Sequence, residues 1–469
     1  MVAPEHDAHL KALEAALGPG VVFHDGMTRS LFSTDASRMP GACFAVIRPR
    51  DESQVLELLR VAQEREISLV PRGAGTSNTG SAHSLAHQIV LDMSLFSQIR
   101  DISPVDQVAV VEPGVLTGQL QAAAWAKGLF YPPDPASARF STIGGNVATC
   151  AGGLRAVKYG VTRDYVLGLR AGLLGGGLLR VGGRFLKTSA GYDLVRLMVG
   201  SEGTLAVFTE IVLRLLPRPA SASTHLASFP DEKSALAAAD AILVAGILPR
   251  AIEYMDRDVV RLLEAQPGPK MASGARLLVE IDGAQTQVDE ERHIVDRVLL
   301  QAGATSCLAA NDEEGREGLW AGRRSISQTV SQSYKAKSSQ DLGVPRSQLA
   351  DCVASIKAAG VAHGIRVLTY GHAGDANLHF NFVYDPDDPA QVTGHQAAVA
   401  DALMIVREAY GTMTGEHGIG AKKRRVFTES LDPTSLAMMR GIKELFDPKN
   451  LLNPGKILAP VESLRGESL

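Results

Sequence analysis

The pattern of apolar and polar positions changes near residue 220. Before that point the chain is rich in glycine and in short apolar runs that end in turn residues, which is typical of strands. The predicted strands are Ala45–Pro49, Ser68–Pro71, Ile89–Asp92, Val108–Gly114 and Phe208–Leu216. Helical periodicity predicts helices over Glu52–Glu66, with Ser53 as its N-cap, and over Thr117–Lys127. Because these elements mix without regular strand–helix–strand spacing, the pattern favours an α+β fold over a doubly wound sheet.

Longer helices alternate with strands beyond Leu215–Pro219, which we interpret as a domain boundary. The predicted elements are the strand His225–Phe229, the helix Asp231–Ala245, the strand Arg276–Asp282 and the helix Thr286–Ala302. Their order predicts an open antiparallel sheet with helices on one face. A last amphipathic helix is predicted over Asp432–Phe446. We therefore divide the chain into segments 1–40, 41–219, 220–425 and 426–469.

Composition restricts the class of ligand. At 469 residues the chain is long enough for two or three domains, each with its own core. Its net charge is −4 and it has no long basic or acidic run, which argues against binding to nucleic acid or to a membrane surface. Small molecules are the expected ligands.

The cysteines and the N-terminus indicate the compartment. None of the four cysteines forms a CxxC pair, which argues against a zinc ribbon, a thioredoxin-type motif or an iron–sulfur cluster and fits a reducing compartment. Residues 1–17 predict a short amphipathic helix without the features of a signal peptide. The most apolar stretch, Val166–Gly183, is too short and too broken by arginine and glycine to span a membrane. We expect a cytoplasmic protein without an integral membrane segment.

Three glycine-rich segments in the first half suit a flat ligand that carries phosphate. Arg72–Gly80 follows a predicted strand, and its glycines would let backbone N–H groups converge on an anion. Asn78 stands where a dinucleotide fingerprint requires its third glycine, which argues against a Rossmann site. The other two segments are Pro132–Gly160 and Gly191–Leu205. A single such loop is often only a tight turn, but their recurrence favours a binding site.

Histidines near the C-terminal end carry the candidate chemistry. In a strand that follows Ala376, His379 and Asn381 share one face and three aromatic side chains take the other. His372, His379 and Glu416 would supply three metal ligands and leave one position open, as in a catalytic metal site. His417 is then a candidate acid or base. Buried histidines with ordinary hydrogen bonds are the competing interpretation.

Taken together, these motifs resemble a known family. The glycine-rich segments, in this order, are similar to the FAD-binding domain of the vanillyl-alcohol oxidase/p-cresol methylhydroxylase superfamily. The sequences GHAGDANLH (371–379), GEHGIG (415–420) and DPKNLLNPGK (447–456) resemble its FAD-linked D-2-hydroxyacid dehydrogenases, which include glycolate oxidase flavin subunits, D-lactate dehydrogenases and D-2-hydroxyglutarate dehydrogenases. The resemblance covers roughly residues 40–460 and implies a two-subdomain FAD-binding domain (41–219), a substrate domain (220–425) and a C-terminal segment that returns to the FAD domain.

The resemblance also implies which residues bind FAD, and we expect the flavin to be non-covalent. The pyrophosphate would lie against Arg72–Ser77, and Asn453 would lie near the flavin. The full implied set is Pro71, Arg72, Gly73, Ala74, Gly75, Thr76, Ser77, Pro133, Asp134, Thr142, Gly145, Asn146, Gly152, Gly153, Tyr159, Gly160, Glu202, Gly203, Leu205 and Asn453.

The implied substrate site adds Arg323 as a carboxylate clamp, with Ser327, Asn381 and His417 in substrate contact. His372, His379 and Glu416 would hold a divalent metal, for which zinc is favoured and manganese or iron would also suit. Ser327 replaces a threonine of the 2-hydroxyglutarate enzymes, and Ser339 stands at the position of their distal-carboxylate lysine, with Lys335 and Lys337 nearby. These departures favour a small monocarboxylate, D-lactate or glycolate, over D-2-hydroxyglutarate.

The resemblance leaves the electron acceptor and the partners open. Without cluster-binding cysteines, electrons would leave to a quinone, a cytochrome, an electron-transfer flavoprotein or a separate iron–sulfur subunit. A homodimer is expected only from the family. A flavin-binding subunit without turnover of its own is the alternative from another class, and an alkylglycerone-phosphate synthase is disfavoured because no long extra substrate-binding region is visible.

Overall fold

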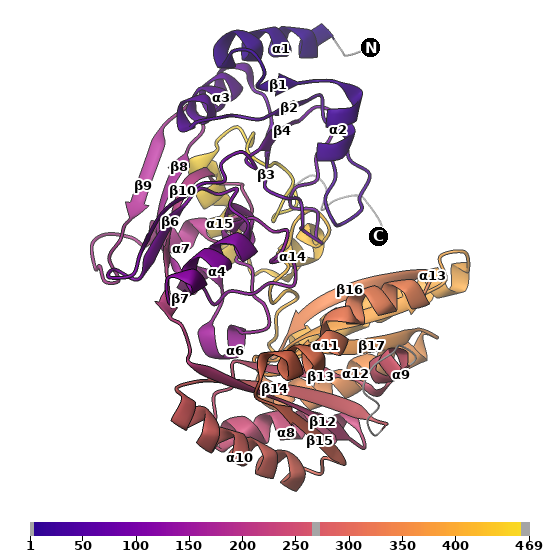
Figure 1. Cartoon of the computed structure of the whole chain (residues 1–469). Helices are drawn as coiled ribbons and strands as arrows, with labels where there is room; N and C mark the ends of the chain where they lie inside the picture. The colour runs from indigo at the N-terminus through magenta and orange to yellow at the C-terminus, as the bar shows by residue number, and fades with distance from the viewer. Residues whose placement is uncertain (1–3, 265–272, 461–469) are drawn as a thin grey trace. The chain divides into compact units, whose positions relative to one another are not determined.

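A computed structural model of the chain describes residues 4–264 and 273–460 (Figure 1). The first three residues of the predicted N-terminal helix and the last nine of the predicted C-terminal segment lie outside these ranges. The chain forms two compact units, which are described separately. Unit 1 contains residues up to 151, residues 161–218 and residues from 416 onward, and unit 2 contains residues 152–160 and 219–415.

Unit 1 contains two main sheets and a small ribbon. A four-stranded sheet has the order β1-β2-β4-β3, with β2, β4 and β3 parallel. A five-stranded antiparallel sheet has the order β5-β6-β10-β8-β9, and β7 pairs with β11. The strands are β1 Val22–Phe23, β2 Ala45–Ile47, β3 Leu69–Arg72, β4 Ile89–Asp92, β5 Ile99–Ser103, β6 Val108–Val111, β7 Leu129–Phe130, β8 Val166–Gly172, β9 Leu178–Gly182, β10 Val207–Arg214 and β11 Leu216–Pro217. The helices are α1 Pro4–Leu17, α2 Gly26–Phe32, α3 Glu52–Arg65, α4 Thr117–Ala126, α5 Ile143–Thr149, the 3₁₀ turn η1 Thr162–Asp164, α7 Leu194–Met198, α14 Arg424–Ser430 and α15 Pro433–Phe446.

The core of the four-stranded sheet is covered by α1 and α3, whose apolar stripes pack against β2, β4 and β3. Helix α3 begins one residue after Asp51, whose carboxylate accepts a hydrogen bond from the N–H of Gln54 at 3.0 Å. The prediction that Ser53 is the N-cap was therefore wrong. Its hydroxyl instead donates to Asp51 at 2.5 Å, because it lies inside the first turn of the helix.

The C-terminal segment extends the four-stranded sheet. Leu69 donates its N–H to the carbonyl of Leu451 at 2.8 Å, and Asn453 donates its N–H to the carbonyl of Leu69 at 2.7 Å. Residues more than 380 positions apart in sequence therefore lie side by side at the edge of β3. This places Asn453 next to the strand that leads into the glycine-rich loop 72–80.

Unit 2 is built on one seven-stranded sheet with the order β15-β12-β14-β13-β17-β18-β16, in which every neighbouring pair is antiparallel. The strands are β12 Ser221–Phe229, β13 Ala251–Met255, β14 Ala275–Gly283, β15 Ser306–Ala310, β16 Ala336–Gly343, β17 Arg366–His372 and β18 Asn377–Tyr384. The helices are α6 Ala156–Tyr159, α8 Glu232–Val244, α9 Arg257–Glu264, α10 Gln285–Gln301, α11 Glu313–Ser333, the 3₁₀ turn η2 Arg346–Gln348, α12 Leu349–Ala362 and α13 Pro389–Glu408.

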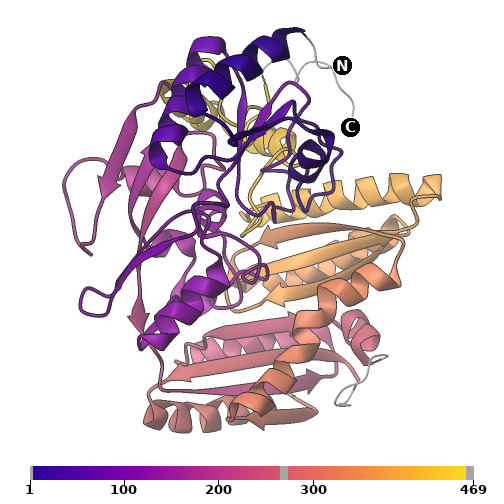
Figure 2. The ribbon, with the colours of Figure 1, turned by 45° about the horizontal axis from the view of Figure 1, so that its top comes forward.

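Two hydrophobic cores lie on the two faces of this sheet. Helices α8, α10, α12 and α13 pack on one face of the sheet, and the ribbon of unit 2 can be followed in Figures 1 and 2. That face carries Phe380 and Phe382, so the predicted aromatic face of β18 is confirmed. Helices α9 and α11 pack on the other face. Helix α9 contributes Val259 and Val260, and α11 contributes Trp320, Ile326 and Val330. The predicted antiparallel sheet and the α+β class are confirmed, and α9 and α11 add a partial layer on the second face. That second face also carries the candidate site.

Candidate active site and cofactor cradle

The loop after β3 presents a row of backbone donors. Within the described ranges, the N–H groups of residues 73–78 donate to no acceptor in the protein. A Cβ on Gly73 would lie 2.2 Å from the hydroxyl of Thr142, and Gly75 has a φ of +67°. The side chain of Arg72 is held by the carbonyl of Thr34 at 2.5 Å. A run of backbone N–H groups without acceptors, in a loop that contains glycine, fits the pyrophosphate of FAD.

Glu202 and Asn453 fasten the segments around this loop. The buried carboxylate of Glu202 accepts hydrogen bonds from the hydroxyl of Ser81 at 2.6 Å and from the N–H groups of Ile419 and Gly420 at 2.7 and 2.8 Å. Burial raises the pKa of Glu202. The amide of Asn453 donates to the carbonyls of Ser81 at 2.9 Å and Glu202 at 2.6 Å. Both residues therefore hold the walls of the cradle in place.

A second wall comes from the start of α5. Thr142 caps this helix by accepting from the N–H of Gly145 at 3.2 Å, and Asn146 donates to the hydroxyl of Thr117 at 2.7 Å. The other predicted flavin-binding residues of unit 1 lie in the loops next to these elements. The carbonyl of Pro133 accepts from Gln121, Asp134 follows it, Gly203 approaches Pro71 with a φ of +69°, and Leu205 is buried.

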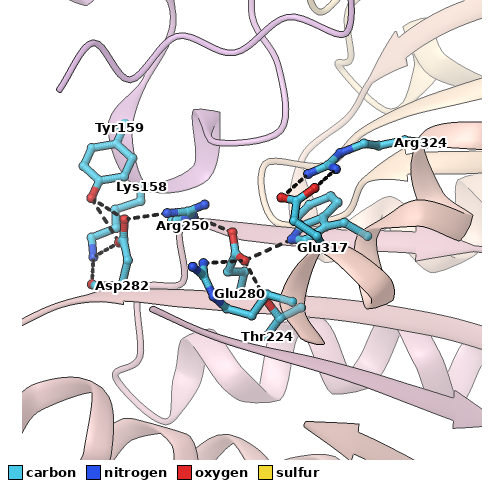
Figure 3. Close-up of polar contacts among 10 residues, drawn as sticks. Lys158, Tyr159, Thr224, Arg250, Glu280, Asp282, Glu317 and Arg324 are labelled. Carbon is cyan, nitrogen blue, oxygen red and sulfur yellow. Dashed lines mark hydrogen bonds and ion pairs between the residues drawn. The ribbon is translucent and has the colours of Figure 1, made fainter. Parts of the chain in front are cut away.

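Four predicted flavin-binding residues lie in unit 2: Gly152, Gly153, Tyr159 and Gly160. Figure 3 shows the reason, because Tyr159 and Lys158 both contact the buried carboxylate of Asp282 on β14. The hydroxyl of Tyr159 donates to its two oxygens at 3.0 and 2.9 Å, and the ammonium of Lys158 donates at 2.7 Å. The segment 152–160 is thus fixed to the sheet of unit 2.

The same polar network continues toward α11. Arg250 contacts Asp282 at 3.4 Å and Glu280 at 2.5 Å (Figure 3). Glu280 also accepts from the indole N–H of Trp320 at 3.0 Å. Burial alone would raise the pKa of Glu280, but the Arg250 guanidinium and the hydrogen bonds lower it below its ordinary value. This network fixes the first half of α11, which then carries Arg323 across the second face of the sheet.

The two predicted metal-binding histidines of unit 2 lie on neighbouring strands. His372 is the last residue of β17 and His379 lies on β18, with their ring centroids 5.3 Å apart and edge to face. Both side chains are buried. Asn381 is two residues further along β18, so it points to the same face of the sheet as His379.

Glu253 on β13 was not predicted, and it links His372 to Arg323. One carboxylate oxygen lies 2.6 Å from Nδ1 of His372, and the other accepts from Nε and Nη2 of Arg323 at 2.6 and 2.5 Å. Glu253 is fully buried. Burial by itself raises its pKa, but Arg323 and His372 outweigh that effect and lower it. Because Nδ1 is bonded to a carboxylate, a metal at His372 would bind through Nε2.

Asp341 on β16 organises the chain that leads to Glu416. Its two oxygens accept from the side chain of Asn377 at 2.7 Å and from the hydroxyl of Thr414 and the N–H of Gly415 at 2.9 and 3.0 Å. Gly415 is the last residue of unit 2, and Glu416 follows it by one peptide bond. Glu416 and His417 belong to unit 1, where the carbonyl of His417 accepts from Thr79 at 3.1 Å.

Tyr370 lies at the centre of the predicted substrate contacts and was also not predicted. The guanidinium of Arg323 lies 5.2 Å from its ring centroid, and the ring of His379 contacts it at 5.7 Å. Its hydroxyl interacts with Ser327 and Asn381, and burial raises its pKa. The structure thus brings Arg323, Ser327 and Asn381 around one phenol.

A lysine adjoins this group. The ammonium of Lys337 donates to the carbonyl and the hydroxyl of Ser327 at 3.1 and 3.3 Å. Ser339 lies opposite Asn381 in the pairing of β16 and β18. Lys335, by contrast, forms an ion pair with Asp385 at 2.7 Å.

Two family models match the chain. The model for the C-terminal domain of FAD-linked oxidases matches residues 218–457, and the model for an FAD-binding domain matches residues 44–182. None of the described helices is long and apolar enough to cross a membrane.

Named relatives align over most of the chain. The glycolate oxidase subunit GlcD of Bacillus subtilis is 37% identical over 437 residues, which cover 92% of each chain. A D-lactate dehydrogenase of Anaerostipes hadrus is 33% identical and covers 88% of this chain and 89% of its own. Among solved structures, p-cresol methylhydroxylase with bound substrate aligns with a TM-score of 0.78 at 17% identity over 98% of both chains. That last match shows the fold, which is the one expected from the motifs.

Proposed function

The chain belongs to the FAD-linked oxidase family, and from this premise we propose that it oxidises a small 2-hydroxyacid, D-lactate or glycolate, to the 2-oxoacid. It is a flavin-dependent oxidoreductase. The observation that carries the choice of substrate class is the placement of Glu253, which contacts both the predicted metal ligand His372 and the predicted carboxylate clamp Arg323. Such a link suits a substrate whose carboxylate and hydroxyl are on adjacent carbons.

FAD fits the first unit, because the free N–H groups of residues 73–78 are suited to its pyrophosphate. FAD held there would supply a flavin ring that can take up a hydride from C2 of the substrate. The protein's contribution is to fix the loops of the cradle, and Glu202 and Asn453 do so through the hydrogen bonds described above.

A divalent metal fits the donor set of His372, His379 and Glu416, and zinc is the ion that we propose. A metal there would act as a Lewis acid toward the substrate hydroxyl. Glu253 supports this assignment because it fixes the ring orientation and the tautomer of His372, as carboxylates do behind metal-binding histidines. Asp341 supports it because it holds the backbone directly before Glu416.

The remaining roles fall to side chains that bind the substrate or move a proton. Arg323 would hold the C1 carboxylate with the donors that Glu253 leaves free, and its planar fork is suited to that. Asn381 and Tyr370 would supply hydrogen bonds beside it. His417 would accept the proton of the substrate hydroxyl, since a neutral imidazole acts as a base near neutral pH.

D-2-Hydroxyglutarate is the second candidate substrate, and one observation favours it. Lys337 lies against Ser327 and would place a positive charge near a distal carboxylate, although the family resemblance puts Ser339 at the lysine position.

A substrate panel separates the two candidates. We would measure kcat/KM with a dye acceptor for glycolate, D-lactate, L-lactate and D-2-hydroxyglutarate, in the wild-type protein and in Lys337→Met. The proposal expects D-lactate or glycolate to be preferred and Lys337→Met to leave that preference unchanged. A preference for D-2-hydroxyglutarate that Lys337→Met lowers by about 10-fold or more would establish the dicarboxylate.

The natural electron acceptor is proposed to be a separate quinone, cytochrome, electron-transfer flavoprotein or iron–sulfur subunit. The four cysteines do not form a cluster-binding motif, so further transfer of electrons from reduced flavin needs such a partner or oxygen.

A further inference from the structure

A second group of metal-ligating side chains lies in unit 2, at the edge of the sheet. His225 is on β12, Cys307 is on the edge strand β15 and Asp296 is on α10. One potential ligand atom from each of these residues lies within 4.8 Å of the other two. Nδ1 of His225 is 2.7 Å from a carboxylate oxygen of Asp296, and the sulfur of Cys307 is 3.8 Å from the same oxygen.

The strand register explains why these side chains converge. His225 pairs with Ala309 and Ala227 pairs with Cys307, so His225 and Cys307 point to the same face of the sheet. Phe380 points to that face as well, which is the one that α10 covers. The group is therefore separated by the sheet from His372, Glu253 and Arg323, which lie on the second face.

The donor set suits a thiophilic divalent ion. Thiolate, imidazole and carboxylate are all ligands of zinc, and ligand distances near 2.0–2.3 Å about one centre bring ligand atoms to roughly 3–4 Å from one another. The two measured distances, 2.7 and 3.8 Å, lie close to that range, so only small movements are needed. Three protein ligands would leave a fourth position for water.

His225 has a hydrogen-bond partner for the ring nitrogen that would not bind the metal. Its second nitrogen, Nε2, lies 3.1 Å from the hydroxyl of Ser223, and both residues are fully buried. With a metal on Nδ1, the ring proton would reside on Nε2 and donate to Ser223. Asp296 is 41% exposed and Cys307 is half-buried, so an ion can reach the group from solvent.

We propose that His225, Asp296 and Cys307 form a second metal site, for zinc or a similar thiophilic divalent ion, distinct from the proposed catalytic metal. On binding, the ion displaces the thiol proton of Cys307, which leaves to solvent, and joins the edge strand β15 to α10. The proposal does not depend on the proposed substrate, because none of the three residues lies in the site around Arg323.

The test is titration of the metal-stripped holoprotein with Co²⁺, followed by absorption spectroscopy. A cysteine thiolate bound to cobalt gives a sulfur-to-metal charge-transfer band, whereas His372, His379 and Glu416 contain no sulfur and cannot produce one. The expected result is a charge-transfer band in the wild type that Cys307→Ser abolishes and Asp296→Asn weakens. Cys352→Ser, which removes a thiol from α12, is the matched control and should keep the band.

Stability gives an independent reading. Added Zn²⁺ should raise the thermal midpoint of the wild type and of Cys352→Ser, but raise that of Cys307→Ser less, because one of two stabilising ions is lost. The proposal is overturned if the wild type shows no thiolate band with Co²⁺, or if the band persists in Cys307→Ser. Failure of catalysis with every hydroxyacid would leave this outcome unaffected.

Discussion

At the residue scale, the carboxylate of Glu253 joins two parts of the proposed chemistry. It contacts His372 through one oxygen and Arg323 through the other, and it is fully buried. A buried carboxylate with two cationic or donor partners is costly to disrupt, because each partner loses its compensation. Glu253 is thus a positioning residue for both the proposed metal ligand and the proposed carboxylate clamp.

The substitution Glu253→Gln tests this role. An amide can donate to Nδ1 of His372, which would place the ring proton on Nε2 and hinder metal binding. We expect metal affinity to fall by about 10- to 100-fold and KM for the hydroxyacid to rise, measured by metal content after dialysis and by steady-state kinetics. Glu280→Gln is the control for metal content alone, since Glu280 is a buried arginine partner that does not contact His372. Wild-type metal content and KM in Glu253→Gln would contradict the role.

Sequence alone could identify the histidines but not their partner. His372 and His379 stand out because they lie in a weakly charged motif that a family resemblance supports. Glu253 lies 119 residues before His372, in the apolar strand AIEYM, and only the pairing of β13 with β17 brings them together. Tyr370 looked like an ordinary strand residue for the same reason. The roles of Arg323, Ser327, Asn381 and His417 remain predictions.

At the scale of elements, helix α3 shows how a boundary depends on one hydrogen bond. Asp51 rather than Ser53 accepts from the N–H of Gln54, so the helix begins one residue after Asp51. We expect Asp51→Ala to lower the free energy of unfolding by about 1 kcal/mol. Ser53→Ala should cost much less, because Ser53 only donates to the capping carboxylate. Urea unfolding of both variants, followed by circular dichroism, is the measurement, and an equal or larger effect for Ser53→Ala would refute the assignment.

The elements that sequence reasoning missed have weak patterns. Helix α11 is long but largely polar, and Trp320, Ile326 and Val330 are its only buried aliphatic or aromatic residues. Strand β16 reads AKSSQDLG and lacks apolar alternation, so its pairing with β18 decides its conformation. The alanine-rich helix α8 and the apolar strands β4 and β14 were predicted to within two residues at each end.

At the scale of the whole molecule, the fold class and the family could be predicted, and both are confirmed. The path of segment 152–160 could not, because its glycines indicate a cofactor loop while Lys158 and Tyr159 fix it to Asp282 in unit 2. Contacts between residues 123 or more positions apart leave no periodic signal in a sequence.

The return of the C-terminal segment to unit 1 predicts a pH effect on stability. The ammonium of Lys456 donates to the carbonyl of His83 at 2.8 Å, and burial, with a smaller contribution from Arg424, lowers its pKa from 10.5 to about 8. Between pH 8 and 10.5 Lys456 keeps its proton in the unfolded chain but has lost it in the folded protein. Because the unfolded state then binds more protons, the free energy of unfolding rises with pH in that window. The rise amounts to about 3 kcal/mol if the whole shift is expressed.

Lys456→Met should remove this rise, since the variant has no ammonium to neutralise. The measurement is the difference in unfolding free energy between wild type and variant at two pH values. One is about pH 7.5, below the window, and the other is about pH 10, near its upper end. Lys449→Met is the control, because Lys449 is an exposed lysine of the same segment that pairs with Glu66. A wild-type minus variant difference that stays constant, or falls as pH rises, would show that Lys456 does not titrate in this way.

The most direct test of the proposed function is the anaerobic bleaching of flavin absorbance in the holoprotein on adding glycolate, D-lactate, L-lactate or D-2-hydroxyglutarate. Each acid is tested before and after treatment with EDTA. We predict fast bleaching by D-lactate or glycolate, its loss after EDTA and its recovery with Zn²⁺, and no bleaching in His417→Ala although that variant keeps its FAD. Bleaching that EDTA leaves unchanged, or rapid reduction of His417→Ala, would contradict metal-assisted oxidation with His417 as the base.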